Sequence, residues 1–228
     1  MPAPNDVKAK IREQGVLPMY STASDAVSIR VLHALYKGGM RVVEYTNRLP
    51  ESLENFKKLK AERDANLKDL LLGVGTVKTV DDARAYIDAG ADFVICPGMI
   101  PEVGKVVLEA GLLWSPGCMT VSEIMVAEQT GSQLIKLFPG DLLGTSYIAA
   151  IKDIFPKLAF MVTGGVDLER DSITNWFKAG ACAVGMGSRL VSKPIIENEK
   201  FDVIETRAKQ AIDIVVNYRK PEAVKEAE

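Results

Sequence analysis

Lys136 lies in a short apolar run, Leu134 to Gly140, that is typical of a buried strand. An ammonium group that leaves water must pair with a carboxylate, reach back to the surface or give up its proton. The first two outcomes are ordinary and involve no chemistry. The third leaves a free amine, which can attack a ketone carbonyl and form a Schiff base. The run alone favours the ordinary outcomes, so other residues must decide between them.

A second candidate group lies in the stretch Val42-Val43-Glu44-Tyr45-Thr46-Asn47-Arg48. Side chains alternate along an extended chain, so Glu44, Thr46 and Arg48 share one face. A carboxylate and a guanidinium then point the same way. Glu44 could form a structural ion pair with Lys136, or it could carry protons beside a nucleophilic amine.

Hydroxyl groups and glycines end three further apolar runs. Thr76 follows Gly73 and Gly75. Glycine at such a place lets a ligand approach the backbone closely, but the same residues are also expected where a strand simply ends in a turn. The last two runs end in Thr163-Gly164-Gly165 and in Gly185-Met186-Gly187-Ser188. Free backbone N–H groups at such loops bind anions, so we expect a phosphorylated substrate or another anionic tail there.

Metal and cofactor chemistry finds no support in the pattern. The single histidine, His33, falls within a helix-like stretch beside Leu32 and Leu35, where a packed or surface residue is expected. The cysteines, Cys96, Cys118 and Cys182, share no ligand spacing with it or with one another. We therefore expect an enzyme with no metal and no cofactor.

The elements that must position these groups repeat one layout. A helix-like segment ends in glycine directly before an apolar run at Gly38-Gly39, Gly90, Gly111, Gly131 and Gly180. Further apolar runs bring the strand candidates to eight; they lie at 16–20, 70–74 and 158–162. Between the strand candidates lie amphipathic stretches, at 25–37, 52–66, 80–89, 121–129, 146–155 and 172–178. This alternation predicts an α/β fold, a single (βα)₈ TIM barrel. The last helix, 201–218, should close the outer ring.

A doubly wound open sheet is the alternative fold. It would normally carry a G-x-G-x-x-G loop after the first strand, where this chain has Tyr20-Ser21-Thr22-Ala23-Ser24. In the barrel, the active site lies at the carboxyl ends of the strands. Alternate strands contribute to one interior layer, so Glu44 on the second strand and Lys136 on the sixth are expected at one level.

Composition sets the broad class. The 228 residues suit one barrel domain over 1–228, with 220–228 as a solvated, frayed tail. With 28 basic and 30 acidic residues and no long run of like charge, the chain predicts a small-molecule partner and no nucleic acid. No segment has the apolar length of a signal peptide core or a membrane span, and the odd cysteine count indicates reduced thiols. We expect a soluble cytoplasmic protein with no membrane partner.

Taken in order, these motifs resemble the 2-keto-3-deoxy-6-phosphogluconate / 4-hydroxy-2-oxoglutarate aldolase family of class I pyruvate aldolases. The similarity covers nearly the whole chain, and its most specific parts are Gly39 to Arg48, Gly73 to Val77, Ser115-Pro116-Gly117, Lys136 to Gly140, Thr163 to Val166 and Ala183 to Ser188. The resemblance implies a homotrimer that acts in carbohydrate metabolism. It would cleave a 2-keto-4-hydroxy acid to pyruvate and an aldehyde.

The resemblance also implies roles for individual residues. Lys136 would form the Schiff base, Glu44 would act as general acid and base, and Arg48 and Thr76 would hold the pyruvyl carboxylate. We place Pro97 and Phe138 among the substrate-binding residues. The phosphate would be held by the two glycine clusters, through Thr163, Gly164, Gly165, Gly185, Gly187 and Ser188.

Two departures from the family pattern concern the phosphate. Tyr20-Ser21 stands where many members carry arginine, and Arg189 stands where several carry tryptophan. Arg189 could replace the missing cation or cover the outer surface. The expected substrate is 2-keto-3-deoxy-6-phosphogluconate, cleaved to pyruvate and glyceraldehyde 3-phosphate. The alternatives are 4-hydroxy-2-oxoglutarate or a phosphogalactonate-type acid, a catalytically silent phosphosugar-binding barrel, and a lysine-independent isomerase or phosphate synthase.

Overall fold

A single parallel sheet forms the centre of the molecule. The computed structural model describes residues 2–220, and all pairings between its strands are parallel. The strands are β1 (Val16–Tyr20), β2 (Val42–Thr46), β3 (Leu71–Gly75), β4 (Phe93–Ile95), β5 (Leu113–Ser115), β6 (Gly117–Cys118), β7 (Leu134–Leu137), β8 (Ala159–Thr163) and β9 (Ala183–Met186).

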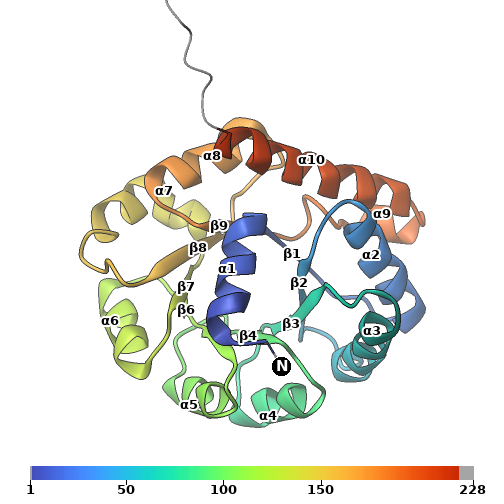
Figure 1. Ribbon diagram of the computed structural model, residues 1–228, viewed down its shortest axis with the longest axis horizontal. Helices are drawn as coiled ribbons and strands as arrows, with labels where there is room; N and C mark the ends of the chain where they lie inside the picture. The colour runs from blue at the N-terminus through green and yellow to red at the C-terminus, as the bar shows by residue number, and fades with distance from the viewer. Residues whose placement is uncertain (1, 221–228) are drawn as a thin grey trace, which may run out of the picture.

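The sheet curls into a barrel, seen end-on in Figure 1. Its strand order is β5-β4-β3-β2-β1-β9-β8-β7-β6, so its two ends are β5 and β6, which only Pro116 separates. Proline has no N–H group to donate to a ladder and interrupts the strand there. The predicted count of eight strands is therefore wrong for strand segments, since residues 2–220 contain nine of them. Because β5 and β6 occupy one place around the barrel, the predicted TIM-barrel class is confirmed.

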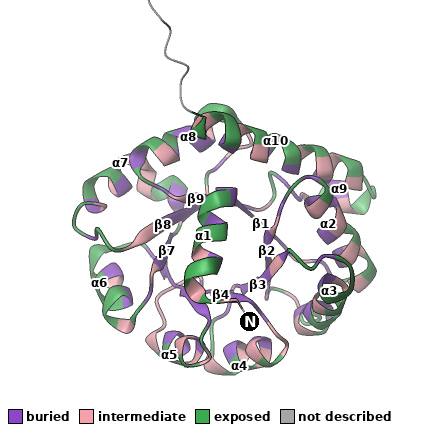
Figure 2. Ribbon diagram, viewed as in Figure 1, coloured by how far each residue is buried: buried purple, intermediate pink, exposed green. Residues whose placement is uncertain are grey.

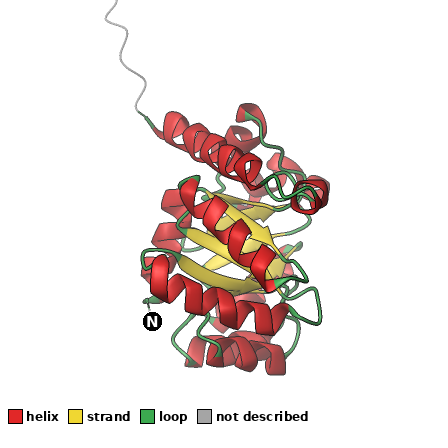
Figure 3. Cartoon of the chain, turned by 90° about the vertical axis from the view of Figure 1, so that its right-hand side faces the viewer, coloured by secondary structure: helices red, strands yellow, loops and turns green. Residues whose placement is uncertain are grey.

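Helices surround the barrel on the outside (Figure 1). They are α1 (Pro4–Gln14), α2 (Asp25–Lys37), α3 (Ser52–Asn66), α4 (Val80–Asp88), α5 (Pro101–Glu109), α6 (Val121–Thr130), α7 (Gly140–Ile151), α8 (Arg170–Ala179), α9 (Lys193–Glu197) and α10 (Phe201–Arg219). Helix α1 differs from the others because it lies across one mouth of the barrel (Figures 1 and 3).

The glycines that end the helical segments behave as predicted. Gly39, Gly90, Gly111, Gly131 and Gly180 all have positive φ, which side chains other than glycine rarely adopt. Helices α2 and α3 have the predicted bounds. Within α7, Gly144 has non-helical φ and ψ of 73° and 167°, so a kink separates the first turn from the helix predicted to start at Ser146, which ends at Ile151 and not at Phe155. Of the predicted frayed tail, 220–228, all but Lys220 lies outside the described residues, and the 1–228 domain boundary stays a prediction.

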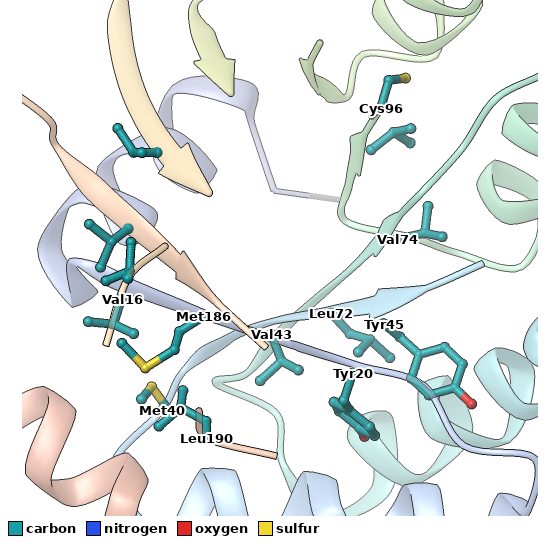
Figure 4. Packing of buried hydrophobic residues seen from close by; sticks show 14 of the residues in the cluster. Val16, Tyr20, Met40, Val43, Tyr45, Leu72, Val74, Cys96, Met186 and Leu190 are labelled. Carbon is teal, nitrogen blue, oxygen red and sulfur yellow. The ribbon is translucent and has the colours of Figure 1, made fainter. Parts of the chain in front are cut away.

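Two apolar cores result from the alternation of side chains along the strands. The larger lies between the strands and the outer helices, and Figure 4 shows part of it, with Val43, Tyr45, Leu72 and Val74 on adjacent strands. The smaller fills the barrel interior and includes Leu17, Val42, Phe93, Leu134 and Met161, together with Val7 and Ile11 of α1. In Figure 2 the strands are buried and the outward helix faces exposed. Because α1 and this small core close one end, the barrel interior opens toward the carboxyl ends of the strands.

Candidate active site

Lys136 points into the barrel. Its neighbours Ile135 and Leu137 belong to the outer core, whereas Leu134, two residues before it, belongs to the interior core. The side chain is only 5% exposed. Its backbone N–H donates to the carbonyl of Pro116 at 2.9 Å, which ties β7 to the interrupted strand. The Nζ atom lies 5.4 Å from the centroid of the Phe138 ring, which is partly exposed. The amine thus sits just inside the open end of the barrel.

Glu44 faces the same interior from β2. It is completely buried, and neither carboxylate oxygen has a hydrogen-bond partner among the described residues. Burial raises the pKa of Glu44, while the nearby charges of Lys136 and Arg48 oppose that shift. Glu44 and Lys136 are therefore near enough to interact electrostatically but do not form a hydrogen-bonded ion pair. The structural ion pair considered from the sequence is not what the barrel contains.

Gly75 makes the room that Glu44 occupies. A Cβ atom at this position would overlap the carboxylate of Glu44, so no other residue type fits without moving it. Thr76 follows directly and has a φ of 61°, which is unusual for a β-branched residue. Strained backbone of this kind tends to occur at functional sites. The Thr76 hydroxyl accepts from Arg48 Nε at 3.5 Å, so the two residues predicted to share a carboxylate are adjacent.

Two further hydroxyls of the interior have no partner. Thr163 Oγ1 and Ser115 Oγ are buried, and neither forms a hydrogen bond among the described residues. Gly185 on β9 leaves space for the Thr163 hydroxyl, since a Cβ there would collide with it. Unpaired buried polar atoms cost about 1–3 kcal/mol each, so the two Glu44 oxygens and these two hydroxyls indicate a surface that a ligand or water completes.

The residues that the sequence predicts to hold a phosphate lie in two places. Gly187 and Ser188 line a hollow of about 590 Å³, together with Arg48, residues 21–24 of the β1–α2 loop, and Lys193, Ile196 and Glu197 of α9. Gly164 and Gly165 lie against the start of α7, where Cβ atoms would meet Gly140 and Asp141. Neither Lys136 nor Glu44 lines the hollow, and Arg48 is the candidate site residue that connects it to Thr76 and the substrate carboxylate position.

Arg189 does not line this hollow. Its Nε lies 2.5 Å from Asp167 Oδ1, and the pair lines a second depression, which shares Ser188 with the hollow. Of the two interpretations of Arg189 left open by the sequence, the structure supports the outer surface. The cations that do line the hollow are Arg48 and Lys193, and Lys193 Nζ lies 3.6 Å from Glu197 Oε1.

The remaining predicted residues are placed as follows. Pro97 follows β4, and its carbonyl lies where a Cβ of Gly117 would be. His33 contacts Glu62 Oε1 at 2.7 Å between α2 and α3, in the layer of outer helices and not in the barrel interior. Across residues 2–220, no three side chains of His, Cys, Asp or Glu gather as a metal site requires. In the same part of the chain, no helix combines the length and apolarity needed to cross a membrane.

Sequence reasoning missed Ser115, the loop residues 21–24 and helix α9. Ser115 lies in a motif that was noticed but given no role. Residues 21–24 follow the first strand where a G-x-G-x-x-G loop is absent, and their sequence alone indicates no binding role. Helix α9 spans five residues, Lys193–Glu197, which is too short for a helical period to show.

A buried lysine and a buried carboxyl at the open end of a parallel barrel define the architecture of a Schiff-base aldolase. Comparison with known proteins agrees. The family model described as KDPG and KHG aldolase matches residues 7–207. The chain therefore belongs to this family and is a Schiff-base aldolase, a carbon–carbon lyase.

Individual relatives span nearly the same length. A 2-dehydro-3-deoxy-phosphogluconate aldolase of Pseudomonas aeruginosa is 28% identical over 92% of this chain and 93% of its own. That of Dickeya dadantii is 32% identical over 81% and 84%. A KDPG aldolase structure from Legionella pneumophila, with pyruvate captured as a covalent carbinolamine, has a TM-score of 0.81 and 26% identity, covering 90% of this chain and 97% of that one. Membership of this family sets aside the catalytically silent barrel and the isomerase or synthase alternatives.

Proposed function

We propose that Lys136 is the nucleophile and Glu44 the general acid and base of this aldolase. The supporting observation is that both side chains are buried in the barrel interior, near each other but unpaired. A free amine on Lys136 attacks the C2 ketone of the substrate, and loss of water gives an iminium ion. The iminium withdraws electrons from C3, so the C3–C4 bond breaks to an enamine and an aldehyde.

Glu44 moves the protons in this scheme. A carboxyl group whose pKa is raised toward neutrality can donate to the departing hydroxyl of the carbinolamine and accept the proton of the C4 hydroxyl. Burial raises the pKa of Glu44 in that direction. Gly75 lets the carboxyl stand close to the wall of β3 and leaves the lumen above it for the substrate.

We assign Arg48 and Thr76 to the substrate carboxylate, with Pro97 and Phe138 as the walls of the pyruvyl pocket. The guanidinium and hydroxyl groups are adjacent, at 3.5 Å, and both are donors that a carboxylate accepts from. The Phe138 ring lies near Nζ of Lys136 and shields one side of the amine.

The preferred substrate is 2-keto-3-deoxy-6-phosphogluconate, cleaved to pyruvate and glyceraldehyde 3-phosphate. Two features support a phosphate at the distal end: the hollow that contains Gly187 and Ser188 adjoins Arg48, and Lys193 adds a cation beside them. Gly164 and Gly165, with the hydroxyl of Thr163 and the gap at Gly185, complete the set we assign to that end. The relatives named for this substrate agree with it.

Trapping tests the nucleophile. Borohydride added with pyruvate should reduce the imine to a secondary amine, seen by mass spectrometry on the peptide that contains Lys136. Lys136→Arg should abolish trapping and turnover, because a guanidinium is not nucleophilic at neutral pH. Adduct on another lysine, or full activity of folded Lys136→Arg, would contradict the assignment.

A comparison of substrates tests whether the protein prefers a phosphorylated acid. Pyruvate release should have a higher kcat/KM with 2-keto-3-deoxy-6-phosphogluconate than with its unphosphorylated form or with 4-hydroxy-2-oxoglutarate. Lys193→Met should reduce that preference, whereas Arg189→Met, the matched change at a cation that does not line the hollow, should not. Equal kcat/KM values for all three acids in the unmodified protein would refute the phosphate site.

We further propose a cytoplasmic homotrimer. Buried thiols agree with a reducing compartment: burial raises the pKa of Cys96 to about 11 and of Cys118 to about 12, which keeps both unreactive. Most of the exposed large apolar side chains fall within 119–142, a candidate subunit contact: Met119, Val121, Met125, Val126, Phe138 and Leu142. Sedimentation showing a monomer at micromolar concentration would contradict the trimer, and recovery in a membrane or secreted fraction would contradict the compartment.

A further inference from the structure

Tyr45 is the centre of a buried hydrogen-bond network on the outer side of β2. Its hydroxyl donates to the carbonyl of Thr22 at 3.0 Å and contacts Ser28 Oγ at 3.0 Å. It accepts from Asn55 Nδ2 and from the Thr22 N–H, both at 3.4 Å. The ring meets Tyr20 edge-on at 5.2 Å, and Figure 4 shows the two rings side by side. One hydroxyl thus joins the β1–α2 loop to α2 and α3.

The β1–α2 loop, residues 21–24, is held from beneath by this network. The Thr22 carbonyl also accepts from Asn55 Nδ2 at 2.9 Å, and the Ala23 carbonyl accepts from the same nitrogen at 3.2 Å. Thr22 Oγ1 donates to the Ser24 carbonyl at 2.7 Å. Ser24 caps α2 by accepting from the Val27 N–H. The loop therefore has one backbone conformation fixed by buried donors before any ligand arrives.

This loop is also one wall of the hollow next to Arg48. Residues 21–24 face Gly187 and Ser188 across it. If Lys136 and Arg48 hold the pyruvyl half, as the proposed function has it, the part of the substrate beyond C4 extends into this hollow. Its shape is then set by a loop whose anchor, Tyr45, follows directly after Glu44 in the chain.

We propose that Tyr45 is a positioning residue that sets specificity for the part of the substrate beyond C4. Tyr45 and Glu44 leave β2 on opposite sides, since Tyr45 belongs to the outer core and Glu44 faces the interior. Tyr45 touches no reacting atom. It acts by ordering the loop in advance, which lowers the conformational entropy lost when a long substrate binds.

Tyr45→Phe tests this role because it removes the hydroxyl and keeps the ring. KM for 2-keto-3-deoxy-6-phosphogluconate should rise about 5- to 10-fold, the effect of losing one or two buried hydrogen bonds. KM for 4-hydroxy-2-oxopentanoate, which ends in a methyl group after C4, should stay within about two-fold, since no part of it reaches the loop. The kcat values and pyruvate trapping at Lys136 should not change.

Asn55→Ala provides a second variant, since Asn55 binds the same loop carbonyls and does not line the hollow. It should likewise raise KM for 2-keto-3-deoxy-6-phosphogluconate and leave KM for 4-hydroxy-2-oxopentanoate within about two-fold. Tyr36→Phe is the matched control, because the Tyr36 hydroxyl binds Asp69 on the surface at 2.6 Å. Its kinetics should equal those of the unmodified protein.

Two results would overturn the inference: an equal rise of KM for both substrates, or no rise for either in folded Tyr45→Phe and Asn55→Ala. Both are distinct from failure of the proposed function. That failure would appear in the unmodified protein, as absent trapping at Lys136.

Discussion

Gln14 and Glu44 are buried polar side chains at opposite ends of the same barrel, and their surroundings differ completely. Gln14, at the end of α1, donates to the carbonyls of Val16 and Val42 at 2.7 and 2.8 Å. Its Oε1 accepts from the N–H groups of Arg41 and Val42 at 2.5 and 2.9 Å. Glu44 has no partner for either oxygen among the described residues. At the closed end, both polar atoms of the Gln14 side chain form hydrogen bonds, which stabilise the fold. At the open end, the Glu44 oxygens are left unpaired and can bind a ligand.

The same contrast holds for the apolar residues. Val7 and Ile11 of α1 complete the interior core at the closed end. At the open end, Gly75 and Gly185 leave space around Glu44 and Thr163 that larger residues would fill. Stability and reactivity are thus assigned to different ends of one structure. Three measurements test whether catalysis depends on the open end and stability on the closed end.

The largest expected effect is on catalysis at the open end. Glu44→Gln keeps the shape of the side chain but cannot exchange protons, so turnover should fall on the order of 10²- to 10⁴-fold. Thermal stability should not fall, because no hydrogen bond of Glu44 is lost. Steady-state kinetics and thermal unfolding of the two proteins check both statements. Turnover within a few-fold of the unmodified protein would show that another group moves the protons.

A smaller effect is expected at the closed end, and on stability alone. Gln14→Leu removes four hydrogen bonds to the backbone near β1 and β2. It should lower the free energy of unfolding by about 2–4 kcal/mol, since buried backbone groups are left unpaired. Urea unfolding measures the loss, and Ile11→Val serves as a mild apolar control. A large change of KM in folded Gln14→Leu would show that the two ends are coupled.

The smallest effect is on how stability depends on pH. Burial raises the pKa of Glu44, so the folded chain holds this proton more tightly than the unfolded chain. The stabilisation is fully present below the ordinary glutamate pKa of 4.5 and is lost as pH rises through the folded-state value. Within that window the free energy of unfolding should fall by about 1.4 kcal/mol per pH unit relative to Glu44→Gln.

Paired urea titrations at a series of pH values measure this difference, because every other titrating group is common to both proteins. A difference that is independent of pH would mean that the Glu44 carboxyl is as well solvated in the folded state as in the unfolded chain. The Glu44 carboxyl would then not be a buried and unpaired group, and the contrast with Gln14 at the closed end would disappear.

Much of this site could be predicted from the order of residues. Lys136 within an apolar run and Glu44 within another follow the period of two that a strand imposes whatever its partners, whereas β2 ends at Thr46 and Arg48 lies beyond it. The glycines before the strands predicted the repeated units, because only glycine adopts the cap conformation readily. The predicted number of strands was wrong at Pro116, which separates β5 from β6. Whether a proline interrupts a strand depends on which ladder hydrogen bond its missing N–H removes.

The barrel, the interior placement of Glu44 and Lys136 and the family to which the chain belongs could all be predicted from the sequence, since these follow from local periodicity and motif order. Only the tertiary structure decided that Glu44 is unpaired, that Arg189 binds Asp167 outside the hollow, and that Tyr45 anchors the β1–α2 loop. Each of these depends on the distance between side chains from elements remote in the chain. Such distances are set by how helices pack around the closed sheet, which no local pattern encodes.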